Sequence, residues 1–581
     1  MQNKVIDDSK IKYGFYARYI KRLLDILISF FVLVIFSPIW VLLCVLVRCN
    51  LGSPIFFKQV RAGKDEKPFE MIKFRTMSDA RDTNGNLLPD EDRFTKFGNF
   101  LRSTSLDEIP ELINILKGEM SIIGPRPLYM IYLPYYTEEE ALRHAVRGGL
   151  TGLAQINGRS HCKWDDRFAF DVEYVKNITF LNDAKIVIDT IKKVLGRDDI
   201  GAPSVDEELP LNMVRADFRK CSREIGCDFS WPKEAFKNVS GEIASAIYNT
   251  PWSKDGATKY FSLARNVLRS IAEKHYCKDC LVLLPAYTCD SVVDPFVESG
   301  YQVITYTIKD NLCIDLDDFV NKLSNKNVTA VLLHAYFGFE ATIVDAVNVL
   351  TNLGKSIVTI DDRTQSVFSK YPIWADYTIG SIRKWGPLPD GAFLCCKNVE
   401  DFVSAGEDTY YVNNIIDAMD CKARYLKGED INKDVFLSDF ARLREYTDNQ
   451  KVAYGISKES LYQFSNLGGE DISKRRFNYQ TLLNFLPKCN LYNKVLTDLN
   501  ESVPFMFPII VKSKIIEMQT YLAKREIYTT RIWSCPEQYN ELIDAKSKKL
   551  FNQVLCIPCD QRYNEYDMLR ICSEVEGYIN G

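Results

Sequence analysis

Two adjacent carboxylates, Asp107 and Glu108, stand out for their residue types and spacing. They lie in the segment RSTSLDEIPEL, which runs from Arg102 to Leu112. An aspartate can attack phosphorus and form an acyl phosphate, and Mg²⁺ typically binds one or two carboxylates together with substrate phosphates. A structural interpretation is also open, because Ser105 and Glu108 have the spacing of a helix capping box.

A basic stretch precedes these carboxylates and suits a diphosphate ligand. Arginine forks match phosphate oxygens, and lysine adds a point charge. Taken alone, the stretch is more typical of a solvated or lipid-facing surface. The candidate phosphate contacts in it are Lys58, Arg61, Lys73 and Arg75.

Two loops follow the carboxylates. The first is Gly124-Pro125-Arg126-Pro127, where a proline on each side of Arg126 predicts a non-helical loop that holds the guanidinium still. The second, over residues 148–159, contains four glycines that allow a close approach of the backbone to a ligand. A plain turn-rich loop is the alternative explanation of the second segment.

The segments around these motifs must position them. The first such segment is a long apolar run over residues 23–47, whose single charge is Asp25. At 1.5 Å per residue it is long enough to cross a hydrocarbon core of about 30 Å. Ser37-Pro38 interrupts the run and predicts a kink. Basic residues flank both ends, as expected if both ends stay on the cytoplasmic face. The residues alone leave a spanning helix and a broken re-entrant helix both open.

The composition narrows the class of protein. Lys and Arg number 73 against 77 Asp and Glu, a net charge of −4, so we expect no nucleic-acid partner. The first hundred residues carry 16 basic against 11 acidic residues, which suits an anionic membrane surface. The 17 cysteines lack the pattern of a secreted disulfide framework and indicate a cytosolic compartment. We interpret Cys277/Cys280 and Cys556/Cys559 as unrelated thiols, with a zinc site as the alternative.

Taken in order, the apolar hairpin, KFRTM, SLDE-IP-EL, GPRP and GLTGLAQINGR resemble the bacterial sugar transferase family, the small monotopic phosphoglycosyl transferases. The resemblance covers about residues 15–195. It implies a re-entrant helix over about 22–48 that anchors the chain in membrane lipid, on the cytoplasmic face of the bacterial inner membrane.

The same resemblance implies a reaction that initiates surface glycan assembly. A UDP-sugar donates its sugar-1-phosphate to polyprenol phosphate, with Mg²⁺ bound by Asp107 and Glu108. Asp107 is the implied nucleophile. Glu108 is its implied partner in binding the metal or in activating the lipid phosphate. The implied nucleotide or phosphate contacts in the two loops are Arg126 and Arg159.

The rest of the chain predicts a separate α/β domain. Residues 196–225 begin with a stretch rich in Gly, Pro and acids, which predicts a linker between a first domain over 1–195 and a second over 226–581. Apolar strand-like runs then alternate with helical stretches, as in a parallel sheet with crossover helices. Asp361-Asp362 follow one such run, and ligands of open α/β sheets bind beyond the carboxyl ends of strands. A strand-end cap is the plainer explanation of these acids.

From about Phe261 onward, this half resembles the sugar-nucleotide aminotransferase family of pyridoxal-phosphate enzymes, fold type I. The resemblance implies a homodimer and a small C-terminal subdomain over about 500–581. It also implies that Lys384 forms the Schiff base with pyridoxal phosphate, while Asp362 pairs with the pyridine nitrogen and keeps the ring an electron sink. The other implied cofactor contacts are Gln365, near the hydroxyl, and Tyr287, near the ring.

The second half departs from the aminotransferase pattern at the cofactor site. Arg363-Thr364 replace a small-residue pair, and Cys289 stands where an aromatic residue usually stacks on the ring. The glycine of the phosphate-binding turn is missing near residues 262–266. Three functions stay open: amination of the sugar nucleotide that the first domain consumes, an enzyme activity on an unrelated amino substrate, or a degenerate scaffold that binds nucleotide sugar or mediates dimerisation.

Overall fold

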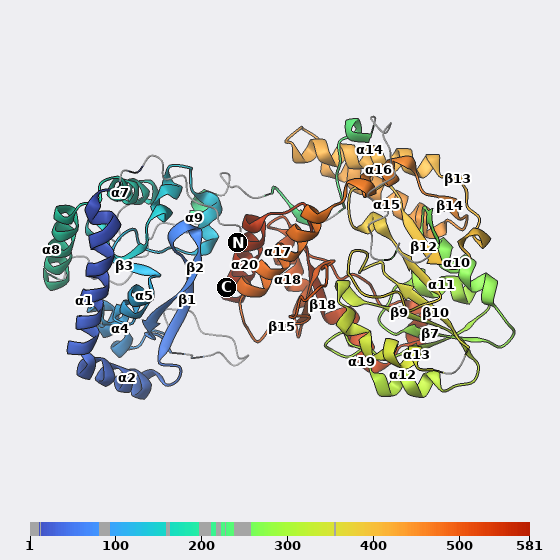
Figure 1. Cartoon of the computed structure of the whole chain (residues 1–581), viewed down its shortest axis with the longest axis horizontal. Helices are drawn as coiled ribbons and strands as arrows, with labels where there is room; N and C mark the ends of the chain where they lie inside the picture. Colours follow the sequence, from blue (N-terminus) through green and yellow to red (C-terminus); the bar gives the residue numbers. More distant parts are fainter. Residues whose placement is uncertain are drawn as a thin grey trace. The chain divides into compact units, whose positions relative to one another are not determined.

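The computed structural model describes two compact units, Met1–Cys221 and Ser222–Ile579, and each is treated by itself (Figure 1). The described residues are 11, 13–78, 80, 93–157, 163–196, 211–215, 222–226, 228–236, 252, 257–353 and 356–580. Arg159 and the basic residues Lys4, Lys10 and Lys12 lie outside them.

The apolar run folds into two helices rather than one. α1 (Lys21–Ile35) follows the short π-helix η1 (Tyr16–Ile20), and α2 (Ser37–Leu51) continues after a break at Phe36. Pro38 occupies the first turn of α2, where its missing N–H costs nothing. The two segments are bent by 68°. Among the described residues, no single helix meets the length and hydropathy of a membrane span, whereas this bent pair does so jointly. The predicted break at Ser37-Pro38 is confirmed.

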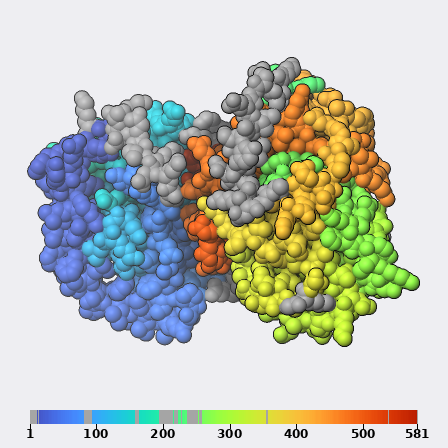
Figure 2. All heavy atoms as spheres, turned by 45° about the vertical axis from the view of Figure 1, so that its right-hand side comes forward, coloured from blue at the N-terminus to red at the C-terminus, as the bar shows by residue number. Residues whose placement is uncertain are grey.

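The polar residues of α1 point into the folded unit. Asp25, which is buried, accepts a hydrogen bond from the Ile122 N–H at 3.0 Å, and Arg22 donates to the carbonyl of Ile115 at 2.7 Å. Lys21 pairs with Asp183 at 2.6 Å. The single charge of the apolar run is therefore satisfied by protein. The outward faces of α1 and α2 are apolar, and this N-terminal segment lies at the surface of its unit (blue in Figure 2).

The remainder of the N-terminal unit is a small α/β fold. A β-hairpin of β1 (Phe56–Ala62) and β2 (Pro68–Phe74) pairs antiparallel, and β3 (Met120–Ile123) pairs parallel with β4 (Gly148–Thr151). The helical elements are η2 (Lys64–Glu66), α4 (Lys96–Ser103), η3 (Leu106–Glu108), α5 (Glu111–Lys117), η4 (Met130–Tyr135), η5 (Glu140–Ala145), α6 (Leu153–Asn157), α7 (Trp164–Lys176), α8 (Phe180–Gly196) and α9 (Leu211–Val214).

The glycines of the second loop serve backbone packing. A Cβ on Gly149 would lie 2.1 Å from the nitrogen of Gly124, and one on Gly152 would lie 2.2 Å from the oxygen of Gly124. Both distances are far below van der Waals contact. Gly124, Gly149 and Gly152 thus let the start of the first loop lie directly against β4. The structure thus gives these glycines a role in backbone packing, and their predicted close approach to a ligand stays a prediction.

The C-terminal unit contains a nine-stranded sheet in the order β13-β14-β6-β12-β11-β10-β9-β7-β8. Strands β11, β10, β9, β7 and β8 run parallel to one another, whereas β12 runs antiparallel to both β11 and β6. The strands are β6 (Ala257–Phe261), β7 (Leu281–Pro285), β8 (Gln302–Tyr306), β9 (Val328–His334), β10 (Val358–Asp362), β11 (Tyr377–Gly380), β12 (Ala392–Cys396), β13 (Ala405–Glu407) and β14 (Tyr454–Gly455).

Both faces of this sheet are buried. Leu281 and Leu283 of β7 belong to one hydrophobic cluster, while Val282 and Leu284 belong to a second on the opposite face. Burial on both faces is typical of parallel sheets covered by crossover helices, and it confirms the predicted α/β class. The helices are α10 (Ala264–His275), α11 (Asp290–Glu298), α12 (Leu316–Leu323), α13 (Val344–Thr351), α14 (Thr409–Leu426), α15 (Lys433–Asn449), α16 (Lys458–Asn466) and α17 (Gly469–Phe485).

A smaller antiparallel sheet follows near the C-terminus. It has the order β15 (Tyr492–Lys494), β16 (Phe507–Val511) and β18 (Val554–Ile557). Strand β17 (Ile527–Tyr528) pairs separately with β5 (Ile225–Gly226). The accompanying helices are α18 (Ile515–Ala523), α19 (Ala545–Gln553) and α20 (Glu565–Asn580).

Candidate active sites

Asp107 and Glu108 lie in the single 3₁₀ turn η3, between α4 and α5. Ser105, which precedes the turn, has left-handed backbone angles (φ 54°, ψ 18°), a strained conformation for a residue other than glycine. Its side chain makes no capping hydrogen bond. The capping-box interpretation was therefore wrong: the α-helix begins only at Glu111, after Pro110.

Two cations converge on Glu108. The Lys73 ammonium lies 2.8 Å from Oε1 of Glu108, and the Arg126 guanidinium lies 2.7 Å from the same atom. Burial alone would raise the pKa of Glu108, but the charges of Arg126 and Lys73 outweigh it and hold that pKa well below its usual range. Glu108 is therefore ionised at neutral pH.

Asp107 has the opposite electrostatic setting. Its side chain is buried, and burial raises its pKa above the ordinary value, followed by repulsion from the Glu108 carboxylate. The charges of Lys73, Arg102 and Arg126 oppose that rise. Two neighbouring carboxylates thus have their pKa values pushed apart, which is a common way for one site to divide two roles between similar groups.

The remaining phosphate candidates are arranged differently. Arg61 lies over the Tyr129 ring, with 3.7 Å between its guanidinium carbon and the ring centroid. Burial lowers the pKa of Arg61, and the nearby charge of Arg126 lowers it further. Lys58 instead pairs with Glu70 on an exposed face at 3.1 Å, and Arg75 donates to the carbonyl of Ser53 at 3.2 Å. Of the candidate phosphate contacts that the structure describes, Lys73 and Arg126 lie against Glu108. Arg61 lies at the edge of this cluster, near Arg126.

Glu111 is a member of this cluster that the sequence analysis did not single out. Its Oε1 lies 3.1 Å from the Lys73 ammonium, and the residue is 1% exposed. Its position three residues after Glu108 was the available signal, because residues three apart return to the same side of a helical turn. Lys73 therefore bridges two carboxylates.

The described residues contain no group of three or more histidine, cysteine or carboxylate side chains arranged to hold a metal ion. Asp107 and Glu108 still offer adjacent carboxylate oxygens, which are the donors that Mg²⁺ prefers. They fit an ion that takes its other ligands from water and from a diphosphate.

Comparison with known proteins identifies this part of the chain. The family model for bacterial sugar transferases matches residues 16–197. The uncharacterized sugar transferase EpsL of Bacillus subtilis is 52% identical over 181 residues, which are 31% of this chain and 90% of that protein. The chain belongs to the bacterial sugar transferase family.

Two further relatives of this sugar transferase domain carry named activities. The UDP-glucose:undecaprenyl-phosphate glucose-1-phosphate transferase of Escherichia coli is 39% identical over 186 residues, 30% of this chain and 40% of that protein. The undecaprenyl-phosphate galactose phosphotransferase of Salmonella typhimurium is 37% identical over 199 residues, 31% of this chain and 42% of that protein. The chain spans less than half the length of these two relatives.

We expect Lys73→Met to lower kcat/KM of the sugar transferase domain by roughly 10²-fold, because it removes a fixed cation beside the Asp107 and Glu108 carboxylates. Lys58→Met provides a matched control, since an exposed pair contributes only about 0–1 kcal/mol. Release of UMP from a UDP-sugar measures both variants. Equal losses in the two variants would contradict the assignment of Lys73 to the site.

The C-terminal unit has its own candidate site at the carboxyl ends of β9 and β10. Asp362 ends β10 and lies beside His334, the last residue of β9. The two side chains are 3.5 Å apart, and Asp362 also accepts a hydrogen bond from the Thr364 N–H at 2.9 Å. Burial would raise the pKa of Asp362, but these contacts outweigh it and lower that pKa. Asp362 is a buried, ionised carboxylate.

Lys384 follows β11 at the end of η10 (Ile382–Lys384) and is half-buried. In the part of the chain that the structure describes, its amine has no hydrogen-bond or ion-pair partner. Burial lowers the pKa of Lys384, and the charges of Arg383 and Arg265 lower it further, against Cys289 and Asp362. An enclosed amine without a partner fits a lysine that bonds covalently to a carbonyl compound.

Gln365 and Tyr287 have other contacts. The side-chain oxygen of Gln365 accepts a hydrogen bond from the Phe337 N–H at 2.7 Å. The Tyr287 ring is fully buried, and it packs edge-on against Trp533 and Phe551 at 4.9 Å each. The structure thus places Tyr287 in the aromatic core.

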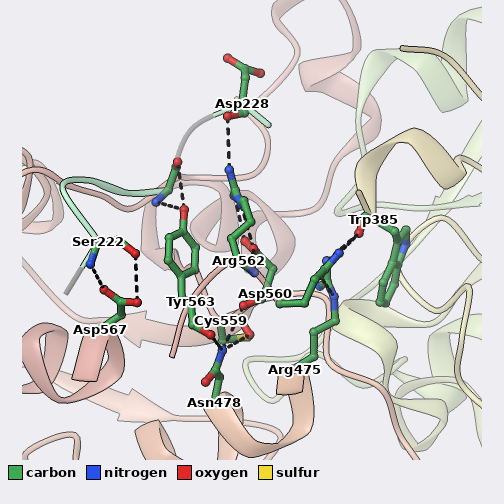
Figure 3. Close-up of polar contacts among 12 residues, drawn as sticks. Ser222, Asp228, Trp385, Arg475, Asn478, Cys559, Asp560, Arg562, Tyr563 and Asp567 are labelled. Atoms are coloured by element: carbon green, nitrogen blue, oxygen red, sulfur yellow. Dashed lines mark hydrogen bonds and ion pairs between the residues drawn. The ribbon is translucent and has the colours of Figure 1, made fainter. Parts of the chain in front are cut away.

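The carbonyl of Trp385, next to Lys384, is held from the C-terminal part of the unit. Gln561 donates to it at 2.7 Å and Arg475 at 3.1 Å, and Figure 3 shows Arg475 directed at Trp385. The Trp385 ring also donates to the Thr364 carbonyl at 2.9 Å. These contacts tie the Lys384 turn to the turn that follows Asp362.

Solved structures that resemble this unit include sugar aminotransferase CalS13 from Micromonospora echinospora, with 13% identity, a TM-score of 0.43, and coverage of 61% of this chain and 99% of that chain. Helicobacter pylori PseC, an aminotransferase involved in the biosynthesis of pseudoaminic acid, aligns with 14% identity, a TM-score of 0.44, and coverage of 62% and 99%.

Proposed function

We propose that the sugar transferase domain moves a sugar-1-phosphate from a UDP-sugar to polyprenol phosphate through a covalent intermediate on Asp107, initiating surface glycan assembly. The observation that carries the proposal is the buried Asp107 beside the Glu108–Lys73–Arg126 cluster, in a domain whose relatives include named undecaprenyl-phosphate transferases.

The first step breaks the diphosphate. A carboxylate oxygen of Asp107 bonds to the sugar-linked phosphorus, the bond from that phosphorus to the bridging oxygen breaks, and UMP leaves with the electron pair. Lys73 and Arg126 offset the negative charge that develops on the phosphate oxygens. Mg²⁺ held by Asp107 and Glu108 would add further charge neutralisation on the diphosphate.

The second step restores the enzyme. An oxygen of polyprenol phosphate attacks the phosphorus bound to Asp107, and the carboxylate leaves, giving a polyprenyl-diphosphate-linked sugar. Glu108 stays ionised through its contacts with Lys73 and Arg126, so it would help to hold Mg²⁺ or would activate the incoming lipid phosphate. Arg61, at the edge of the Glu108–Lys73–Arg126 cluster, and Arg159 are the remaining proposed phosphate contacts. We propose no phosphate contact for Lys58 or Arg75.

The proposed reaction is tested with a panel of UDP-sugars, including UDP-glucose, UDP-galactose and UDP-N-acetylglucosamine. Each is incubated with undecaprenyl phosphate and membranes containing the full chain, and UMP release is measured. We expect release from at least one donor that depends on the lipid. Release from none, with the protein folded, would contradict the proposal.

The proposed location is the cytoplasmic face of the bacterial inner membrane, with α1 and α2 re-entering as a monotopic anchor. The polar anchoring of Asp25 and Arg22 to the folded unit supports an α1 that starts at that face. Single cysteines at Tyr13 and Ser53, each in a cysteine-free background, are expected to react with an impermeant maleimide from the same side of inner-membrane vesicles. Labelling from opposite sides would establish a spanning segment.

We propose that the C-terminal unit is a pyridoxal-phosphate-dependent sugar-nucleotide aminotransferase that works as a homodimer. Lys384 would bind the cofactor covalently, Asp362 would hold its ring nitrogen, and Gln365 would contact its hydroxyl. The bound cofactor would supply an electron sink for proton transfer at the amino-bearing carbon. The second candidate, a scaffold that binds nucleotide sugar without catalysis, is favoured by Cys289, which offers no ring to stack on a cofactor.

A further inference from the structure

Arg126, whose guanidinium contacts Glu108, lies in a loop with few backbone anchors. Pro125 and Pro127 lack an N–H group, so two of the three residues can accept backbone hydrogen bonds but cannot donate them. The Pro125 carbonyl accepts a hydrogen bond from the Gly149 N–H at 2.9 Å. The next carbonyl, that of Arg126, needs a donor from elsewhere in the fold.

Arg143 is that donor. Its Nη2 donates to the Arg126 carbonyl at 2.7 Å, a short charge-assisted bond. Arg143 lies in η5 and is 2% exposed. It contacts the backbone of Arg126, while the Arg126 side chain extends to Glu108 at 2.7 Å.

Arg143 is itself fixed by a carboxylate. Its Nε and Nη2 donate to Oδ2 of Asp171, in α7, at 3.0 and 2.8 Å. The guanidinium also packs near the rings of Tyr136 and Phe168, with centroid distances of 5.6 and 5.7 Å. A planar guanidinium can bind a carboxylate and a carbonyl in one fixed arrangement, which an ammonium group cannot reproduce.

We propose that the buried Arg143–Asp171 pair positions Arg126 for the donor diphosphate, by holding the Arg126 carbonyl between two prolines. Arg143 is a positioning residue, because it acts through Arg126. The inference rests on the proposed function, since Arg126 is assigned there as a phosphate contact.

A double-mutant cycle with the full chain in membranes separates positioning from general structural support. We expect Arg143→Met to raise KM for the UDP-sugar that releases most UMP by about 10-fold or more, with a smaller change in kcat, as Arg126→Ala does. In the Arg126→Ala background, Arg143→Met should add less than twofold. Coupling of this kind identifies residues that act as one unit.

The matched control is Arg215→Met. Arg215 donates to the Tyr135 carbonyl at 2.9 Å and pairs with Glu140 at 2.7 Å, so the substitution removes a comparable set of bonds without touching Arg126. We expect its effect on KM to be under twofold and independent of Arg126→Ala. Thermal unfolding in detergent verifies that each variant folds.

Multiplicative effects of Arg143→Met and Arg126→Ala, or an unchanged KM in Arg143→Met, would overturn the inference. If Arg143→Met does not fold, Asp171→Asn replaces it in the same cycle, because it keeps Arg143 but weakens its anchor; absence of coupling there overturns the inference equally. Failure of the proposed function is distinct, since the unsubstituted chain would then release no UMP.

Discussion

Asp107→Asn is expected to abolish turnover by the sugar transferase domain, with a loss of roughly 10³-fold or more in UMP release, as when other enzymes lose their nucleophile. The side-chain amide has nearly the same shape as the carboxylate but no charged oxygen to attack phosphorus. Because Asp107 is buried next to Glu108, the substitution also removes repulsion between two carboxylates, so the fold should be retained.

The covalent step is measured separately. With a donor radiolabelled in its sugar-linked phosphate and no lipid acceptor, the unsubstituted protein should retain label after acid quenching, and Asp107→Ala should retain none. Asp65→Asn is the matched control, because Asp65 lies in the β1–β2 turn with left-handed backbone angles that asparagine adopts readily. Full activity or undiminished label in the Asp107 variants would exclude the aspartyl mechanism.

Part of this site could be predicted because its members lie in short motifs of distinctive composition. Asp107, Glu108, Lys73 and Arg126 were singled out from the sequence, and the structure places them in one cluster. Glu111 was not, because its role depends on Lys73 arriving from a strand 38 residues earlier. Local sequence indicates which side chains can react, whereas the partners of those side chains depend on tertiary packing.

The basic stretch shows the same limit. Alternation along β1 and β2 sends neighbouring basic residues to different sides of the hairpin, so Lys73 reaches Glu108 while Lys58 pairs with the exposed Glu70. Composition cannot distinguish them, because both are lysines in the same hairpin. Which lysine faces Glu108 depends on the strand register, and that register is set by pairing across the whole hairpin.

The bend in the apolar run was predictable for a different reason. Proline acts on the backbone locally, so the break before Ser37-Pro38 follows from the sequence. The role of Asp25 could not be predicted from the sequence alone, because a charge in an apolar run suggests a function within the membrane. In the structure its carboxylate instead accepts a hydrogen bond from the Ile122 N–H of β3. Only the packing of α1 against β3 explains it.

In the C-terminal unit, the acids at the end of β10, Asp361 and Asp362, were predicted to be ordinary strand-end caps or cofactor ligands. In the structure the two acids have different partners. Asp361 pairs with the buried Arg363 at 2.8 Å, and Asp362 faces His334. Arg363, a departure from the aminotransferase pattern, thus lies with Asp361 rather than with Asp362. Alternation at the end of β10 accounts for the division, because neighbouring strand residues point to opposite faces.

Lys384→Ala is expected to eliminate the visible absorbance that the protein acquires when pyridoxal phosphate is added. The free amine form of Lys384 is the one that can bond to the cofactor aldehyde, and burial lowers the pKa of this amine below that of an ordinary lysine. Uptake should therefore rise with pH and be well advanced at a pH where exposed lysines remain protonated.

Lys370→Ala is the matched control, because Lys370 is an exposed lysine in the same unit and should leave the absorbance unchanged. Borohydride reduction followed by peptide mapping locates the attachment: the label should lie on Lys384 in the unsubstituted chain. If the unsubstituted protein acquires no absorbance but still binds a UDP-sugar in a calorimeter, the scaffold function replaces the aminotransferase function. A labelled lysine other than Lys384 would instead move the cofactor site, because the proposed site predicts attachment at Lys384 alone.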